Sequence, residues 1–253
     1  MPFAFSPWDL ALLAVVTAMG TLLAYLPDPR WKAFLLSLPF PFTLANLSLG
    51  EPIGPSHALG LWSLLLFVHL VRWLHYGLRL PILAAIALPA GLNLALGAAL
   101  NHLVPRTGWT LWAALGPAVA AGAVLLRVLP RRREPAHRSP LPVAVKLAAI
   151  AGLVALLVLL KRALGGFMTM FPMVATIAAY EARHSLHTIG RQVPVVMVTM
   201  GPMMAAMWLL QRAAGVSVPL SLLAGWGVFL ALLAPIMVVQ LRAAGPPELP
   251  QNE

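Results

Sequence analysis

Two short segments of the chain carry glutamate, histidine and glycine at the same spacing. The first reads EPIGPSHALG over residues 51–60 and the second reads EARHSLHTIG over residues 181–190. Glu51 and His57 in the first correspond to Glu181 and His187 in the second. Carboxylates and imidazoles are costly to place inside a membrane, where they usually mark proton or substrate sites. These four residues are the leading candidates for chemistry.

Three functional interpretations of the two segments stay open. In the first, the four residues carry protons. In the second, Glu181, His184 and His187 bind a metal, since an E-x-x-H pair puts two ligands on one helical face. The first segment lacks that pair, so we expect no metal and no cofactor. In the third, His184, His187 and Arg191 bind an anionic head such as a phosphate or a lipid carrier, with arginine as a bidentate partner.

A plain structural interpretation competes with all three. Each segment would then be an interfacial turn whose glutamate and histidine cap helix ends and face water. The local sequences also differ, because two prolines and a glycine prevent a regular helix in the first segment. The second segment can be helical. We expect Glu181, His184, His187 and Arg191 to form one polar helical face there.

The composition is that of an integral membrane protein. Hydrophobic residues make up 60% of the 253 and charged residues 9%, with no cysteine, so disulfides and thiol chemistry are excluded. The apolar runs lack period-2 alternation, which predicts an all-α, polytopic protein. The N-terminus, MPFAFSPWDL, does not resemble a removable signal peptide. We expect nine spans, at residues 8–26, 33–49, 57–76, 81–103, 109–129, 143–160, 166–180, 193–210 and 217–240.

The loops predict an orientation. Thirteen lysines and arginines lie after spans one, three, five and seven or at the C-terminus, and four lie on the other side. Because cytoplasmic loops are enriched in these residues, we expect the N-terminus outside and the C-terminus in the cytoplasm of a prokaryotic inner membrane. The formal charge of +10 reflects this topology, and no nucleic-acid motif is present.

The chain also matches itself. Residues 13–105 align without a gap on residues 143–235, with 19 identities in 93 positions that include the paired glutamates and histidines. An odd number of spans separates the copies, so the halves should be inverted relative to each other, as in many secondary transporters. We expect a first four-span repeat (1–106), a linking helix with a basic cytoplasmic loop (107–141), a second, inverted four-span repeat (142–242) and a disordered tail (243–253).

Spans two and seven are short and carry helix-breaking residues early. These are Pro39 and Pro41 in span two and Gly165, Gly166 and Pro172 in span seven. Proline inside a helix removes a hydrogen bond and kinks the chain. Non-helical backbone is tolerated in a membrane only against protein or a water-filled cavity. We therefore predict that both spans are broken or re-entrant.

Residues 38–67, which contain LPFPFTLANLSLG and LGLWSLLLF, resemble the small GlpM-type bacterial membrane proteins of about four spans. Those proteins pair an aromatic-proline segment with a following Gly-Leu-Trp-Ser helix. The resemblance covers about 30 residues. It implies that a four-span unit was duplicated, and it carries over no mechanism.

The preferred function is a small secondary transporter or flippase for an anionic or lipid-linked solute in the lipid bilayer, and proton coupling is one version of this hypothesis. The alternative is a non-transporting scaffold or assembly subunit that contacts its partner through the 130–140 loop. A homo-oligomer is compatible with either. We do not expect an enzyme, because the sequence contains no nucleophile–base set and no aspartate-rich motif.

Overall fold

The computed structural model describes residues 6–26, 29–130, 134, 142–181 and 183–242, and every regular element in them is a helix. The chain is an all-α, multi-pass membrane protein. In chain order the elements are α1 (Pro7–Tyr25), α2 (Pro29–Ser37), α3 (Phe40–Leu49), α4 (Pro55–Arg72), the π-helix η1 (Trp73–Gly77), α5 (Ile82–Leu103), α6 (Gly108–Val128), α7 (Val143–Leu164), α8 (Phe167–Met170), α9 (Met173–Glu181), α10 (Leu186–Ala213) and α11 (Val218–Arg242).

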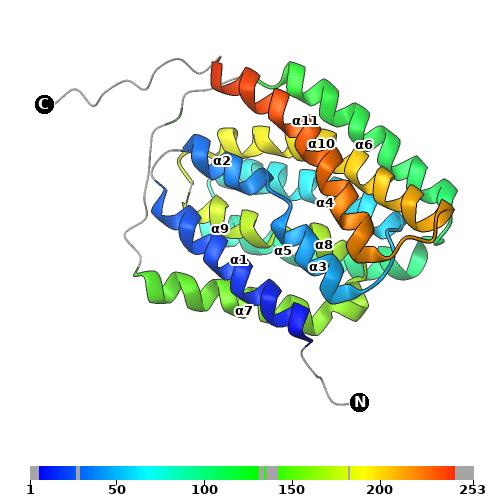
Figure 1. Ribbon diagram of the computed structural model, residues 1–253. Helices are drawn as coiled ribbons and strands as arrows, with labels where there is room; N and C mark the ends of the chain where they lie inside the picture. The colour runs from blue at the N-terminus through cyan, green and yellow to red at the C-terminus, as the bar shows by residue number, and fades with distance from the viewer. Residues whose placement is uncertain (1–5, 27–28, 131–133, 135–141, 182, 243–253) are drawn as a thin grey trace, which may run out of the picture.

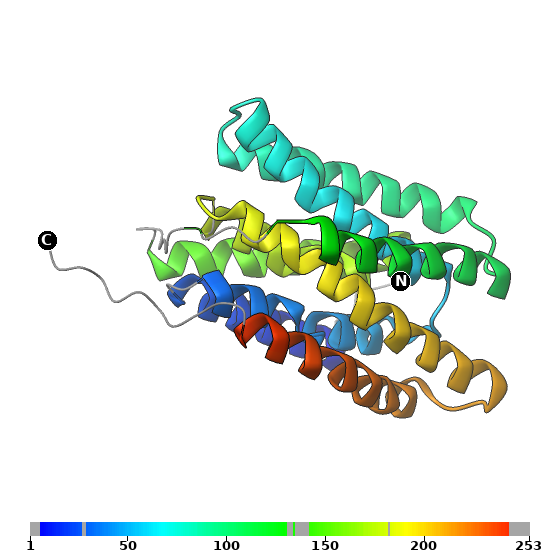
Figure 2. The same ribbon diagram turned by 90° about the horizontal axis from the view of Figure 1, so that it is seen from above.

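The long helices run roughly side by side, so the bundle has two ends (Figures 1 and 2). We call the basic end the one at which α2, α5, α7 and α10 begin, at the left in both views. The Asp9 end is the opposite one, at which α1, α4, α6 and α11 begin. Side-chain contacts agree with this arrangement. His187 of α10 stacks on Tyr76 at the basic end, and Lys161 of α7 reaches Asp9 at the other.

Six helices of the described residues are long and apolar enough to cross a membrane, which is fewer than the nine spans expected. They are Pro55–Gly77, Ile82–Leu103, Gly108–Val128, Leu147–Leu164, Leu186–Ala213 and Val218–Val239. The difference has a physical cause. The segments expected to form spans two and seven are divided into helices of nine, ten, four and nine residues, too short to cross singly. The apolar part of α1, Pro7–Leu23, is also shorter than a full crossing helix.

The two divided segments break at proline and glycine. Pro39 immediately precedes α3 and Pro41 lies in its first turn, where a missing backbone N–H costs nothing. Gly165 follows α7 with a positive φ of 52°, a conformation that glycine adopts without strain. Gly166 then precedes α8, and Pro172 lies between α8 and α9. The four residues of α8 are all buried, so protein covers this break.

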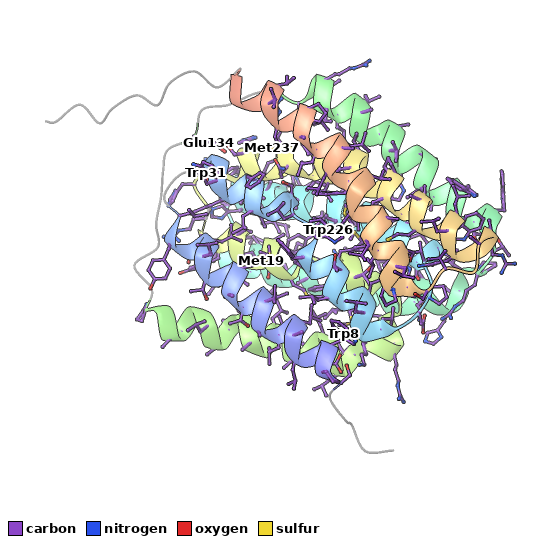
Figure 3. The ribbon with its side chains drawn as sticks, in the orientation of Figure 1. Trp8, Met19, Trp31, Glu134, Trp226 and Met237 are labelled. Atoms are coloured by element: carbon purple, nitrogen blue, oxygen red, sulfur yellow. The ribbon has the colours of Figure 1, made fainter. Side chains whose placement is uncertain are left out.

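Aromatic side chains lie at both ends of the bundle. Figure 3 shows Trp8 near the start of α1 and Trp31 near the start of α2, at opposite ends, and both are exposed. Trp73 and Trp109 are exposed as well, at the end of α4 and the start of α6. Tryptophan is enriched where a membrane meets water, so the placement fits a bundle that spans a bilayer.

The longest helix, α10, packs against α6 through close backbone approach. A Cβ on Gly122 of α6 would lie 2.8 Å from the Met197 Cβ and 3.1 Å from the Pro194 carbonyl oxygen. Small residues let membrane helices approach until dispersion contacts and weak hydrogen bonds form. Around this seam the methionines of α10 are fully buried, at Met197, Met200, Met203, Met204 and Met207.

This contact yields a stability prediction. Gly122→Ala should destabilise the protein by about 1–3 kcal/mol, because the added methyl group overpacks a seam bounded partly by backbone. Gly116→Ala is the matched control on the same helix, since nothing lies within 4 Å of the Cβ it would gain. Thermal unfolding of both variants in detergent measures the difference. Equal melting temperatures would contradict the close packing of α6 on α10.

Candidate functional site

The two Glu-x5-His segments lie at opposite ends of the bundle. Residue Ile53 in the first donates its backbone N–H to Gln211 Oε1 at 2.8 Å, near the C-terminal end of α10. His187 in the second lies in the first turn of α10. At 1.5 Å per residue, the 24 residues from 187 to 211 span about 36 Å. The structure therefore places two separate candidate sites rather than one that contains both glutamates.

Glu51 lies in the connector between α3 and α4, at the protein surface. Its carboxylate is 3.8 Å from Arg106 Nη1, and the two side chains are 45% and 67% exposed. An exposed ion pair at this distance contributes little to stability because water and salt screen it. The geometry is that of a surface contact between connectors, which matches the interfacial-turn interpretation for this residue.

His57, in the first turn of α4, is almost completely buried. The backbone N–H of Gly54 donates to its Nδ1 at 3.1 Å, which fixes the ring orientation. Its Nε2 has no hydrogen-bond partner among the described residues. A Cβ on Gly166 would collide with the His57 ring and with Ser56 Oγ. The imidazole thus lies against the break that precedes α8, where only glycine leaves room for it.

The second segment does not form the single polar helical face that the sequence predicted. Glu181 is the last residue of α9 and is fully buried, and α10 begins only at Leu186. His184 lies in the turn between the two helices and is exposed. His187 and Arg191 are half-buried on α10, one turn apart. The break separates Glu181 from the histidines, so the E-x-x-H spacing does not place ligands on one helix.

Glu134, from the connector after α6, caps the start of α10. Its carboxylate oxygens accept backbone N–H bonds from His187 at 3.1 Å and Thr188 at 2.7 Å. Figure 3 shows Glu134 at the same end of the bundle as Trp31. A carboxylate at a helix N-terminus satisfies free donors and is favoured by the helix dipole. The described residues contain no group of three or more histidine, aspartate or glutamate side chains arranged to hold a metal ion.

A cavity of about 410 Å³ opens at the basic end beside this helix start. Its lining includes Arg72, Trp73, Tyr76, His187 and Arg191. The Tyr76 ring stacks on the His187 ring with centroids 5.7 Å apart. Its hydroxyl donates to the Arg183 carbonyl oxygen at 2.9 Å. These contacts join the end of α4 to the start of α10, so the cavity has walls from both long helices.

The π-helix η1 shapes the α4 wall of this cavity. One wide turn of Trp73–Gly77 replaces the regular α-helix, and the Leu78 N–H closes it on the Trp73 carbonyl oxygen at 3.1 Å. Arg79, directly beyond, has a φ of 56°, unusual for a residue with a side chain. Such turns are frequent at functional sites because they redirect side chains from a helix axis.

The Asp9 end holds a buried ion pair. Lys161 Nζ of α7 lies 2.9 and 2.8 Å from the two carboxylate oxygens of Asp9 on α1. Ser48 Oγ of α3 also donates to Asp9 Oδ1, and Lys161 Nζ lies 3.4 Å from the Ser48 carbonyl oxygen. Asp9 is 1% exposed and Lys161 22%. The pair, together with Ser48, therefore joins three helices drawn from both halves of the sequence.

Sequence reasoning did not assign Asp9, Arg72 or Tyr76 to a candidate site. The sequence around Asp9 accounts for it as part of a capping box with Ser6 at the start of α1, and does not indicate the ion pair with Lys161. A single acid inside an apolar run was the available signal. Nothing in the sequence indicates that Arg72 and Tyr76 lie beside His187, because those contacts join residues more than a hundred positions apart.

No known protein family, curated protein or solved structure matches the chain. The resemblance of residues 38–67 to GlpM-type proteins therefore stays a prediction.

The ion pair yields a second stability prediction. Lys161→Met should destabilise the protein by about 3–5 kcal/mol, because it leaves the Asp9 carboxylate buried without its cation. The double variant Asp9→Asn with Lys161→Met should recover most of that loss. Arg162→Gln is the control, since it removes one positive charge from the exposed neighbouring position. Unfolding in detergent measures all three, and a Lys161→Met effect no larger than that of Arg162→Gln would contradict the assignment.

Proposed function

We propose that the chain is a small secondary transporter or flippase of a prokaryotic inner membrane that moves an anionic or lipid-linked solute. In this proposal it consists of two inverted halves of four crossings each, joined by α6. The first half comprises α1 to α5 and the second α7 to α11. The N-terminus lies outside and the C-terminus in the cytoplasm.

Three further crossings beyond the six long helices complete the proposed topology. One is α1, and the others are the pairs α2–α3 and α8–α9. In Figures 1 and 2, α2 begins at the basic end and α3 ends near the opposite one, while α8 and α9 run the other way. Neither half of a pair is long enough alone. In series, α2–α3 covers Pro29–Leu49, which matches a span's length, and α8–α9 covers the shorter stretch Phe167–Glu181. Discontinuous helices of this kind form the substrate sites of many secondary transporters.

The observation that carries the proposal is reciprocal packing between the halves. Helix α4 packs against α8, and its counterpart α10 packs against α2; α8 and α2 are the first helices of the two divided spans. The linking helix α6 contacts both α4 and α10, and α1 contacts its own counterpart α7. His57 and His187 occupy the first turns of the corresponding helices α4 and α10. These matched contacts are what a pseudo-two-fold axis between inverted halves would produce.

The matching has departures. Helix α5 contacts α7, whereas their counterparts α11 and α1 have no comparable contact among the described residues. Helix α1 packs against α9, whereas α7 has no comparable contact with α3 among the described residues. Two inverted halves that are not equivalent are expected of a transporter, because a conformation open to one side packs its halves differently.

The proposed proton-coupling groups are Glu181, His187 and His57, because they are buried or half-buried beside the broken helices. Glu51 is less suited because it is exposed and pairs with Arg106. The scaffold alternative relied on the 130–140 loop, of which the described residues include only Pro130 and Glu134. No feature of the described residues favours it over transport.

The inverted topology can be tested by labelling. The chain has no cysteine, so Pro52→Cys and His184→Cys each introduce a single thiol at an exposed position. A membrane-impermeant maleimide added to intact cells should label Pro52→Cys and leave His184→Cys unlabelled. Permeabilised cells serve as the control and should label both. Labelling of both thiols in intact cells would contradict the opposite placement of the two Glu-x5-His segments.

Transport can be tested in proteoliposomes with two anionic probes, fluorescent phosphatidylglycerol and radiolabelled phosphate. We expect at least one to cross faster than in protein-free liposomes, at a rate that depends on a pH gradient. Glu181→Gln should abolish that dependence because a buried carboxylate is lost. Glu51→Gln is the matched control and should retain it, because that carboxylate is exposed. Rates equal to those of protein-free liposomes for both probes would contradict the proposed function.

A further inference from the structure

We propose that the cavity between α4, η1 and α10 at the basic end is a binding site for the phosphate group of an anionic phospholipid. The cavity measures about 410 Å³, within the usual range for small-molecule sites. This inference rests on the proposed function only for the role of the site in transport. The site itself can be tested by ligand binding alone.

The charge of the cavity selects an anion. Two arginines, Arg72 and Arg191, line it together with His187, and no carboxylate is among its lining residues. Arg72 has no carboxylate partner in the described part of the chain. Glu134 accepts two backbone N–H bonds at the start of α10 and is not among the residues that line the cavity. The cavity wall is therefore positively charged.

The two arginines come from different helices and line the same cavity. Arg72 is the last residue of α4, and its Nη1 lies 4.0 Å from the position of a Cβ on Gly190 of α10. Arg191 is the next residue along α10. A guanidinium presents donors in a planar fork that matches two phosphate oxygens, so two of them can hold one phosphate from two sides. The stacked Tyr76 and His187 rings fix the wall between them.

The position of the cavity favours a lipid as the source of the phosphate. Trp73 lines it and is 56% exposed, which suits a side chain at the level of lipid headgroups. Leu129 also lines it, and the preceding Val128 and Val124 on α6 are exposed apolar residues. A headgroup in the cavity would thus have apolar surface beside it for acyl chains. The basic end is also the side on which the chain concentrates its arginines.

Native mass spectrometry of the detergent-purified protein tests the inference. Titration with a short-chain phosphatidylglycerol should show one tight site, and phosphatidylcholine should bind more weakly there. Arg72→Gln and Arg191→Gln should each weaken phosphatidylglycerol binding about tenfold or more, as expected when a charge-assisted hydrogen bond is lost. Arg127→Gln is the matched control. It removes the same charge at the same end from an exposed position outside the cavity, and should change the affinity less than twofold.

Further arms separate the alternatives. Arg72→Lys keeps the charge and should retain part of the binding, and unfolding curves check that each variant is folded. If inorganic phosphate displaces the lipid in an Arg72-dependent way, the cavity also accepts the soluble anion; if it does not, the lipid is the source. The proposed site would be contradicted if Arg72→Gln and Arg127→Gln weaken phosphatidylglycerol binding equally. It would also be contradicted if neither cavity variant weakens that binding. If both cavity variants lose lipid binding and the wild-type protein shows no flux, the binding site is supported and the transport proposal is contradicted.

Discussion

A helix that breaks inside an apolar layer leaves backbone amide and carbonyl groups that only protein or trapped water can satisfy. The chain breaks this way twice, between α2 and α3 and around α8. The packing of the bundle follows from covering those breaks. Helix α4 lies against α8 and α10 against α2, and the four residues of α8 are completely enclosed. The most buried of the long apolar helices, α10, packs against α2, α4, α6 and α11.

Covering the breaks brings polar residues to buried positions. His57 lies against the glycine that precedes α8, and any side chain there would collide with the ring. Glu181 ends α9 in a fully buried position. Ionisable groups buried in a membrane protein commonly mark functional sites, which is why these positions carry the proposed coupling role.

Charged side chains are arranged differently at the two ends of the bundle. At the Asp9 end a carboxylate and an ammonium neutralise each other, and Ser48 completes the hydrogen bonding. This arrangement ties α1, α3 and α7 together. At the basic end two arginines face a cavity whose lining has no acid. At the Asp9 end the opposite charges are therefore paired within the protein. The basic end instead has a positively charged cavity at the membrane surface, where anionic headgroups are concentrated.

The sequence alone determined the class of protein, because a 60% hydrophobic composition with long apolar runs is stable only as membrane helices. It also indicated where the chain breaks, since proline and glycine act locally through missing donors and permitted backbone angles. The repeated glutamates and histidines could be found, but not their surroundings. Only the tertiary structure decided that Glu51 is exposed, that Glu181 is buried, that Asp9 pairs with Lys161 and that Arg72 and Arg191 line one cavity. Those outcomes depend on which distant helices pack together, and local sequence patterns carry no record of contacts between residues a hundred or more positions apart.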